Sequence, residues 1–123
     1  MSKILYNINY LEEQDVNPDG SLKSHVTKGK PTLVMVQGNF CGYCTQAKPA
    51  FQKYANNNKG KVLCATIQGD GEIKGEKELG SRLQKIKYGF RGYPDYVKYK
   101  GGKKVPGEIS GRTLEDLEKF GKI

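Results

Sequence analysis

Residues 32–44 have the sequence TLVMVQGNFCGYC, in which a run of apolar residues leads into two closely spaced cysteines. The run Thr32–Val36 is continuous and rich in β-branched residues, as is typical of a central strand covered on both faces. Apolar residues recur at helical spacing from Cys41 to about Asn56, which predicts a helix over that range. We therefore expect a buried strand followed by a helix that begins at the cysteines.

The rest of the chain alternates between strand and helix patterns. The other predicted elements are a strand over residues 4–10, a short helix around 22–26, a buried strand over 61–67, a helix over roughly 75–88, strands over 96–100 and 103–109, and a last helix after Thr113. The paired glycines Gly101 and Gly102 predict a tight hairpin, and Pro106 places the second hairpin strand at an edge. The order β-α-β-α-β-α-β-β-α predicts an α/β fold with a central mixed sheet and helices on both faces.

Length and cysteine content indicate a single domain over residues 1–123 in a reducing compartment. No apolar run approaches the roughly 20 residues that a membrane span requires, so we expect no membrane partner. The N-terminal residues Met1–Asn7 do not form the apolar core of a signal peptide, and three cysteines do not suggest a secreted disulfide framework. We therefore predict a soluble cytoplasmic monomer.

The chain is basic, with 21 Lys and Arg against 13 Asp and Glu and a formal net charge of +8. This excess would attract acidic partners. The basic residues nevertheless fall in short groups broken by apolar residues, as on the solvated faces of helices and strands. No nucleic-acid-binding motif accompanies the charge, so nucleic acid is not expected to be the main partner.

The motif Cys41-Gly42-Tyr43-Cys44 separates two thiols by two residues at a predicted helix start. Unpaired N–H groups and the helix dipole stabilise a thiolate there, which lowers the pKa of the first cysteine. We assign Cys41 as the nucleophile. Cys44, one helical turn on, is assigned as the resolving thiol that attacks the mixed disulfide between Cys41 and a substrate.

The segment Phe40–Cys44, after a hydrophobic strand, resembles the active-site segment of the thioredoxin family. Pro49, five residues past the second cysteine, and the segment Lys87–Pro94 extend this resemblance, which covers most of the chain from Thr32 onward. It implies the thioredoxin fold and a cis-proline at Pro94 that faces the cysteines. The substrate-binding residues that it implies are Phe40, Gly42, Tyr43, Tyr93 and Pro94.

The same resemblance implies a thiol-disulfide oxidoreductase that passes electrons from its dithiol to disulfide-containing proteins. A reductase or a small thiol would regenerate the dithiol, and no metal or organic cofactor is needed. Met35, however, stands where the family usually has a buried aspartate that helps to deprotonate the resolving cysteine. Tyr43 replaces the family's proline, and Asp95 follows the cis-proline where threonine is common, so the substrate surface is altered.

Two alternatives accompany this interpretation. A structural zinc site at Cys41 and Cys44 would need two more ligands, and Cys64 and His25 are the candidates left. Cys64 lies in an apolar run, which favours a buried and inert thiol, and His25 is expected to be an exposed helix residue. In the second alternative, the fold serves as a non-enzymatic interaction module that uses its basic surface.

Overall fold

The computed structural model describes residues 8–38, 42–69, 78–87, 90 and 92–122. Its strands are β1 (Asn9–Tyr10), β2 (Thr32–Gln37), β3 (Leu63–Gln68), β4 (Asp95–Lys100) and β5 (Lys103–Val105). Its helices are α1 (Ser24–Thr27), α2 (Gly42–Asn57), α4 (Leu83–Ile86) and α5 (Leu114–Phe120), and a 3-10 turn covers Glu13–Asp15. The order of these elements follows the predicted β-α-β-α-β-α-β-β-α pattern.

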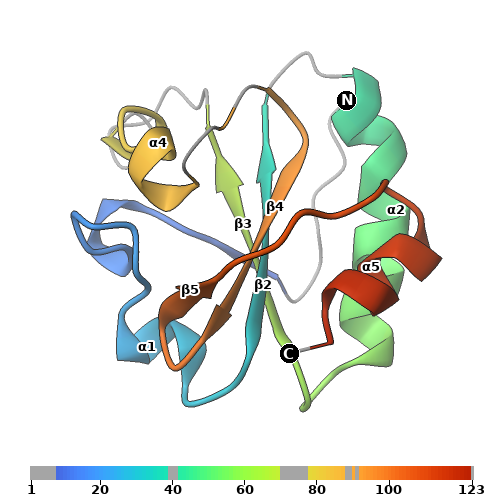
Figure 1. Cartoon of the computed structure of the whole chain (residues 1–123), viewed down its shortest axis with the longest axis horizontal. Helices are drawn as coiled ribbons and strands as arrows, with labels where there is room; N and C mark the ends of the chain where they lie inside the picture. Colours follow the sequence, from blue (N-terminus) through green and yellow to red (C-terminus); the bar gives the residue numbers. More distant parts are fainter. Residues whose placement is uncertain (1–7, 39–41, 70–77, 88–89, 91, 123) are drawn as a thin grey trace.

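The strands form one mixed sheet in the order β1-β3-β2-β4-β5 (Figure 1). β1, β3 and β2 run parallel, whereas β4 and β5 are antiparallel to their neighbours. β2 lies at the centre, and all six of its residues are buried. The prediction of a central strand covered on both faces is therefore confirmed.

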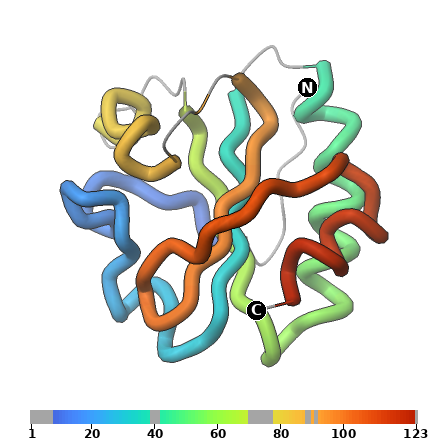
Figure 2. Tube along the Cα trace, in the orientation of Figure 1, coloured from blue at the N-terminus to red at the C-terminus, as the bar shows by residue number. Residues whose placement is uncertain are grey.

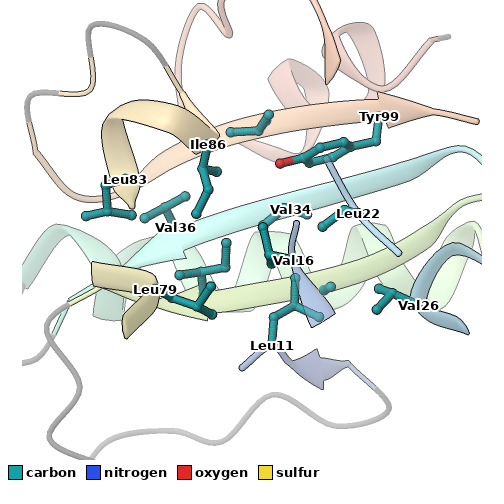
Figure 3. Packing of buried hydrophobic residues seen from close by; sticks show 13 residues of the cluster. Leu11, Val16, Leu22, Val26, Val34, Val36, Leu79, Leu83, Ile86 and Tyr99 are labelled. Carbon is teal, nitrogen blue, oxygen red and sulfur yellow. The ribbon is translucent and has the colours of Figure 1, made fainter. Parts of the chain in front are cut away.

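Helices cover both faces of the sheet, as predicted. Side chains of β2 alternate between two apolar clusters because successive residues of a strand point to opposite faces. Val34 and Val36 join the cluster beneath α1 and α4 (Figure 3). Leu33 and Met35 join the cluster beneath α2 and α5, which lie side by side in the chain trace (Figure 2).

Two predicted elements differ in the structure. The expected helix over 75–88 is interrupted within its described part, where residues 78–80 are helical and α4 begins only at Leu83. The interruption follows Gly80, a residue that disfavours helix, and the Arg82 N–H bonds the Leu79 carbonyl at 2.9 Å in a tighter turn. The expected strand over 103–109 ends at Val105 because Pro106 has no N–H to continue the ladder.

The predicted hairpin turn and the predicted last helix are confirmed. Gly101 and Gly102 form the β4–β5 turn with φ angles of 61° and 79°. The Thr113 hydroxyl accepts a hydrogen bond from Asp116 N at 3.1 Å, and Asp116 Oδ2 accepts one from Thr113 N at 3.2 Å, which completes the capping box of α5. Of the predicted strand over 4–10, residues 8–10 are described, and Asn9 and Tyr10 form β1. None of the helices described here has the length and apolar character needed to cross a membrane.

Candidate functional site

The cis-proline and the start of α2 lie at the same end of the sheet. β2 ends at Gln37, and α2 begins five residues later at Gly42. The Tyr93–Pro94 peptide bond is cis, as predicted, and Asp95 pairs in register with Val36 near the end of β2. The fold therefore brings the segment at Pro94 to the strand end from which the chain leads into α2.

Cys44 is a buried residue in the first turn of α2, with 1% of its surface exposed. It belongs to the apolar cluster that contains Met35 and Tyr96, and the half-buried Tyr93 packs against the same cluster. Cys44 is in the disulfide-bonded state. Cys41 and Phe40 lie outside the described residues, so their predicted roles stay predictions.

Gly42 and Tyr43 are exposed at the start of α2, and 60% of Tyr43 is accessible. The guanidinium carbon of Arg112 lies 4.7 Å from the centroid of the Tyr43 ring, which is the geometry of a cation–π contact. Arg112 precedes the cap of α5 and was not singled out in the sequence. Its isolated position in a loop gives no periodic pattern that could have identified it.

Pro94 lines a cavity of about 250 Å³ at this end of the molecule. The other residues that line the cavity are Asp95, Tyr96, Glu108, Ile109, Ser110, Gly111 and Arg112. Arg112 also lines a neighbouring cavity of about 500 Å³ beside Gln46 and Ala47 of α2. Arg112 therefore contacts the ring of Tyr43 and also lines the cavity beside Pro94, and these two predicted site residues are far apart in the sequence.

Tyr93 packs its ring against the end of β3. Its centroid lies 5.2 Å from that of Phe90, and a Cβ atom on Gly69 would lie only 2.6 Å from the Tyr93 ring and hydroxyl. Because Gly69 has no side chain, the Tyr93 ring can occupy the space beside it. The predicted contact of Tyr93 with a substrate remains a prediction.

Apolar and aromatic residues surround Cys44, and its cluster of described residues contains no carboxylate. Met35 is fully buried and pairs in register with Tyr96, whose hydroxyl is buried without a hydrogen-bond partner in the described part of the chain. Burial raises the pKa of Tyr96 to about 12, although the positive charge of Arg112 opposes the rise. The tyrosine is therefore protonated at neutral pH.

Lys48 is the one charged residue that is buried among the described residues. It lies four residues after Cys44 in α2, and burial lowers the pKa of its ammonium group. No role was predicted for Lys48 from the sequence. The i, i+4 spacing places it on the same side of the helix as Cys44, and this spacing is the signal that could have identified it.

Cys64 and His25 lie apart from these residues. Cys64 is a free, buried thiol in β3, as predicted, and burial raises its pKa to about 12. His25 is exposed, as predicted, and its Nε2 lies 2.8 Å from Asp15 Oδ1. Within the described ranges, no group of three or more His, Cys, Asp or Glu side chains could hold a metal ion.

Known proteins resemble this chain over most of its length. A family model described as Thioredoxin matches residues 14–122. The putative thioredoxin-like protein 453L of Invertebrate iridescent virus 6 is 40% identical over an alignment 123 residues long, and this alignment covers 90% of this chain and 89% of that protein. Protein disulfide-isomerase erp38 of Neurospora crassa is 31% identical over 96 residues, covering 75% of this chain and 24% of that protein.

Solved structures share the fold. The Trx4 domain of ERdj5 superimposes with a TM-score of 0.65 at 19% identity, over 93% of this chain and 91% of that one. Human ERp44 in its zinc-bound form gives a TM-score of 0.67 at 16% identity, over 94% of this chain and 30% of that one. The mixed five-stranded sheet with helices on both faces is therefore the thioredoxin fold.

Proposed function

Because this chain belongs to the thioredoxin family and its function is therefore of the thiol-disulfide oxidoreductase type, we propose that it reduces protein disulfides through Cys41 and Cys44. The observation that carries the proposal is the place of Cys44. It lies in the first turn of α2, at the end of the sheet where the cis-proline Pro94 also lies. Cys64 is a free thiol buried elsewhere in the sheet and takes no part.

In the proposed reaction, the Cys41 thiolate attacks one sulfur of a substrate disulfide. A mixed disulfide forms, and the other substrate sulfur leaves as a thiolate that takes up a proton. Cys44 then loses its proton and attacks the Cys41 sulfur, which releases the second substrate thiol and closes the Cys41–Cys44 disulfide. Two electrons have passed from the dithiol to the substrate, and an external reductase or small thiol returns the protein to its reduced form.

Burial supports this division of roles. With 1% of its surface exposed, Cys44 is not accessible to a folded protein substrate. A thiol in that position suits attack on a neighbouring cysteine, which is what the resolving step requires. The first attack therefore falls to Cys41, which precedes the N-terminus of a 16-residue helix where the helix dipole favours a thiolate.

The environment of Cys44 distinguishes this chain within its family. The buried side chains of the described segments include no carboxylate that could accept the Cys44 proton. Met35 stands at the position where the family usually has a buried aspartate. Release of that proton therefore depends on water or on the leaving substrate thiolate. We expect the resolving step to be the slower of the two thiol exchanges.

Reduction of insulin disulfides by dithiothreitol tests the proposal. The wild-type protein should accelerate the reduction, and Cys41→Ser should abolish the acceleration. Cys64→Ala is the matched control, because it removes a thiol that lies outside the proposed pair and should leave the rate unchanged. Equal rates for wild type and Cys41→Ser would contradict the proposal and favour the non-enzymatic interaction module.

A further inference from the structure

Lys87 joins three segments of the chain through one amine on a largely buried side chain. It caps the C-terminus of α4, and only 10% of its side chain is exposed. Its Nζ lies 2.6 Å from Asp95 Oδ1 and 3.0 Å from Glu108 Oε1, and it donates a hydrogen bond to the Tyr96 carbonyl at 3.0 Å. The amine thus connects the end of α4 to the start of β4 and to the segment between β5 and α5.

Asp95 is the partner through which Lys87 reaches the proposed site. This residue directly follows the cis-proline, and its Oδ1 also accepts a hydrogen bond from Tyr96 N at 2.8 Å. A single carboxylate oxygen therefore accepts hydrogen bonds from both the Lys87 amine and the Tyr96 backbone N–H at the start of β4. The position of Asp95 determines where the chain passes from Pro94 into the sheet.

The two ion pairs of Lys87 differ in strength. Only 20% of the Asp95 side chain is exposed, so the Lys87–Asp95 bond is shielded from water and is a strong, charge-assisted hydrogen bond. The Glu108 side chain is 76% exposed, and ion pairs so open to solvent contribute little. The contact with Asp95 is therefore the one that holds the segment.

The partners of Lys87 form part of the cavity beside Pro94. Asp95, Tyr96 and Glu108 line this cavity of about 250 Å³, whereas Lys87 itself does not line it. Lys87 instead lines a neighbouring cavity of about 220 Å³ together with Tyr96 and Glu108. Its connection to the cavity beside Pro94 therefore runs through the residues that it holds.

We propose that Lys87 is a positioning residue that keeps the segment at Pro94 and Asp95 in the conformation needed to bind an extended peptide. This inference rests on the proposed function. Its specific consequence concerns the KM for peptide disulfides. A small disulfide that makes no contacts along the peptide-binding segment should depend much less on Lys87.

The test compares two substrates, with dithiothreitol as the reductant in both assays. One is a disulfide-linked peptide whose fluorescence rises on reduction, and the other is a small aliphatic disulfide, bis(2-hydroxyethyl) disulfide, which dithiothreitol alone reduces slowly because its leaving thiol has a high pKa. Lys87→Met removes the charge and keeps the length of the side chain. Lys85→Met is the matched control, because the Lys85 side chain is exposed on the same helix.

Lys87→Met should raise the KM for the peptide about tenfold, the change expected when one charged hydrogen bond is lost, and change its kcat much less. The rate with the small disulfide should fall by a clearly smaller factor. Lys87→Arg should recover most of the peptide KM, and Lys85→Met should behave as wild type. If Lys87→Met does not fold, Lys87→Gln carries the same prediction.

A double variant separates positioning from general stability. Lys87→Met combined with Asp95→Asn should raise the peptide KM no further than Lys87→Met does, because both changes break one contact. Equal losses on both substrates, or effects of the two substitutions that multiply, would overturn the positioning role. A wild-type protein inactive on both substrates would contradict the proposed function itself, and the positioning role with it.

Discussion

The guanidinium of Arg112 lies over the ring of Tyr43, with 4.7 Å between the guanidinium carbon and the ring centroid. This contact connects the first turn of α2 to the segment that precedes α5. Cation–π contacts at exposed sites contribute about 0.5–1 kcal/mol. A double-mutant cycle of Tyr43→Ala and Arg112→Ala, followed by urea denaturation, should give a coupling free energy of this size.

Tyr43→Phe provides the control for this cycle. The substitution keeps the aromatic face and removes only the hydroxyl, so the contact with the guanidinium should persist. Arg112→Ala should therefore cost nearly as much free energy of unfolding in the Tyr43→Phe background as in the wild-type protein. A coupling indistinguishable from zero in the cycle with Tyr43→Ala would show that the two side chains do not interact in solution.

Gly69 is required by the packing of Tyr93. Since a Cβ atom at residue 69 would lie 2.6 Å from the Tyr93 ring, Gly69→Ala should displace that ring from its place beside Phe90. Overpacking of this kind lowers the free energy of unfolding by about 1–3 kcal/mol. Urea denaturation of Gly69→Ala measures the loss.

The same experiment in a second background identifies the cause. In a Tyr93→Leu background the overlapping ring atoms are gone, so Gly69→Ala should cost clearly less than it does in the wild-type background. An equal cost in both backgrounds would show that the Tyr93 ring is not what excludes a side chain at residue 69.

Cys64 should make the stability of the protein depend on alkaline pH. Burial raises the pKa of its thiol from 9.0 to about 12, so the folded protein holds this proton more tightly than the unfolded chain does. The resulting stabilisation is fully present below the unfolded pKa of 9.0 and is lost as pH rises through the folded pKa of about 12. Within that window one such group lowers the free energy of unfolding by at most about 1.4 kcal/mol per pH unit.

Cys64→Ala lacks this titration and provides the comparison. The difference in the free energy of unfolding between wild type and Cys64→Ala should therefore shrink between about pH 9 and pH 12, at roughly the slope that linkage sets. Tyr96, whose pKa burial also raises to about 12, affects both proteins alike, whereas the charge of the Cys64 thiolate adds to the burial that raises the pKa of Tyr54, so these two groups titrate as a coupled pair. A difference that stays constant over this range would mean that the Cys64 thiol titrates normally in the folded protein.

The fold was predictable because its main elements carry strong local patterns. The β-branched run at Thr32–Val36 and the helical spacing after Cys41 correspond to β2 and α2, and the capping box at Thr113 marks the start of α5. The two predicted elements that differ from the structure are those in which a glycine or a proline interrupts the hydrophobic pattern. The helix predicted over 75–88 is interrupted after Gly80, and the strand predicted over 103–109 stops before Pro106.

The site was predictable in part. The cis-proline followed from the family resemblance, and the burial of Cys64 followed from its apolar neighbours. The pairs Tyr43–Arg112 and Lys87–Asp95 were not predictable, because each joins segments that only the tertiary fold brings together. Periodicity indicates which face of an element is buried, and it does not specify which charged side chain will meet a given partner.

The redox state of the three cysteines shows whether Cys41 and Cys44 form the reactive pair. The 123-residue protein is equilibrated in buffers of defined redox potential, its thiols are trapped by alkylation, and its disulfides are mapped by mass spectrometry. We predict one reversible disulfide, between Cys41 and Cys44, with a midpoint in the range of about −200 to −270 mV, and a Cys64 that stays a free thiol throughout. A disulfide that contains Cys64, or the absence of a Cys41–Cys44 disulfide even in the most oxidising buffer, would contradict the account.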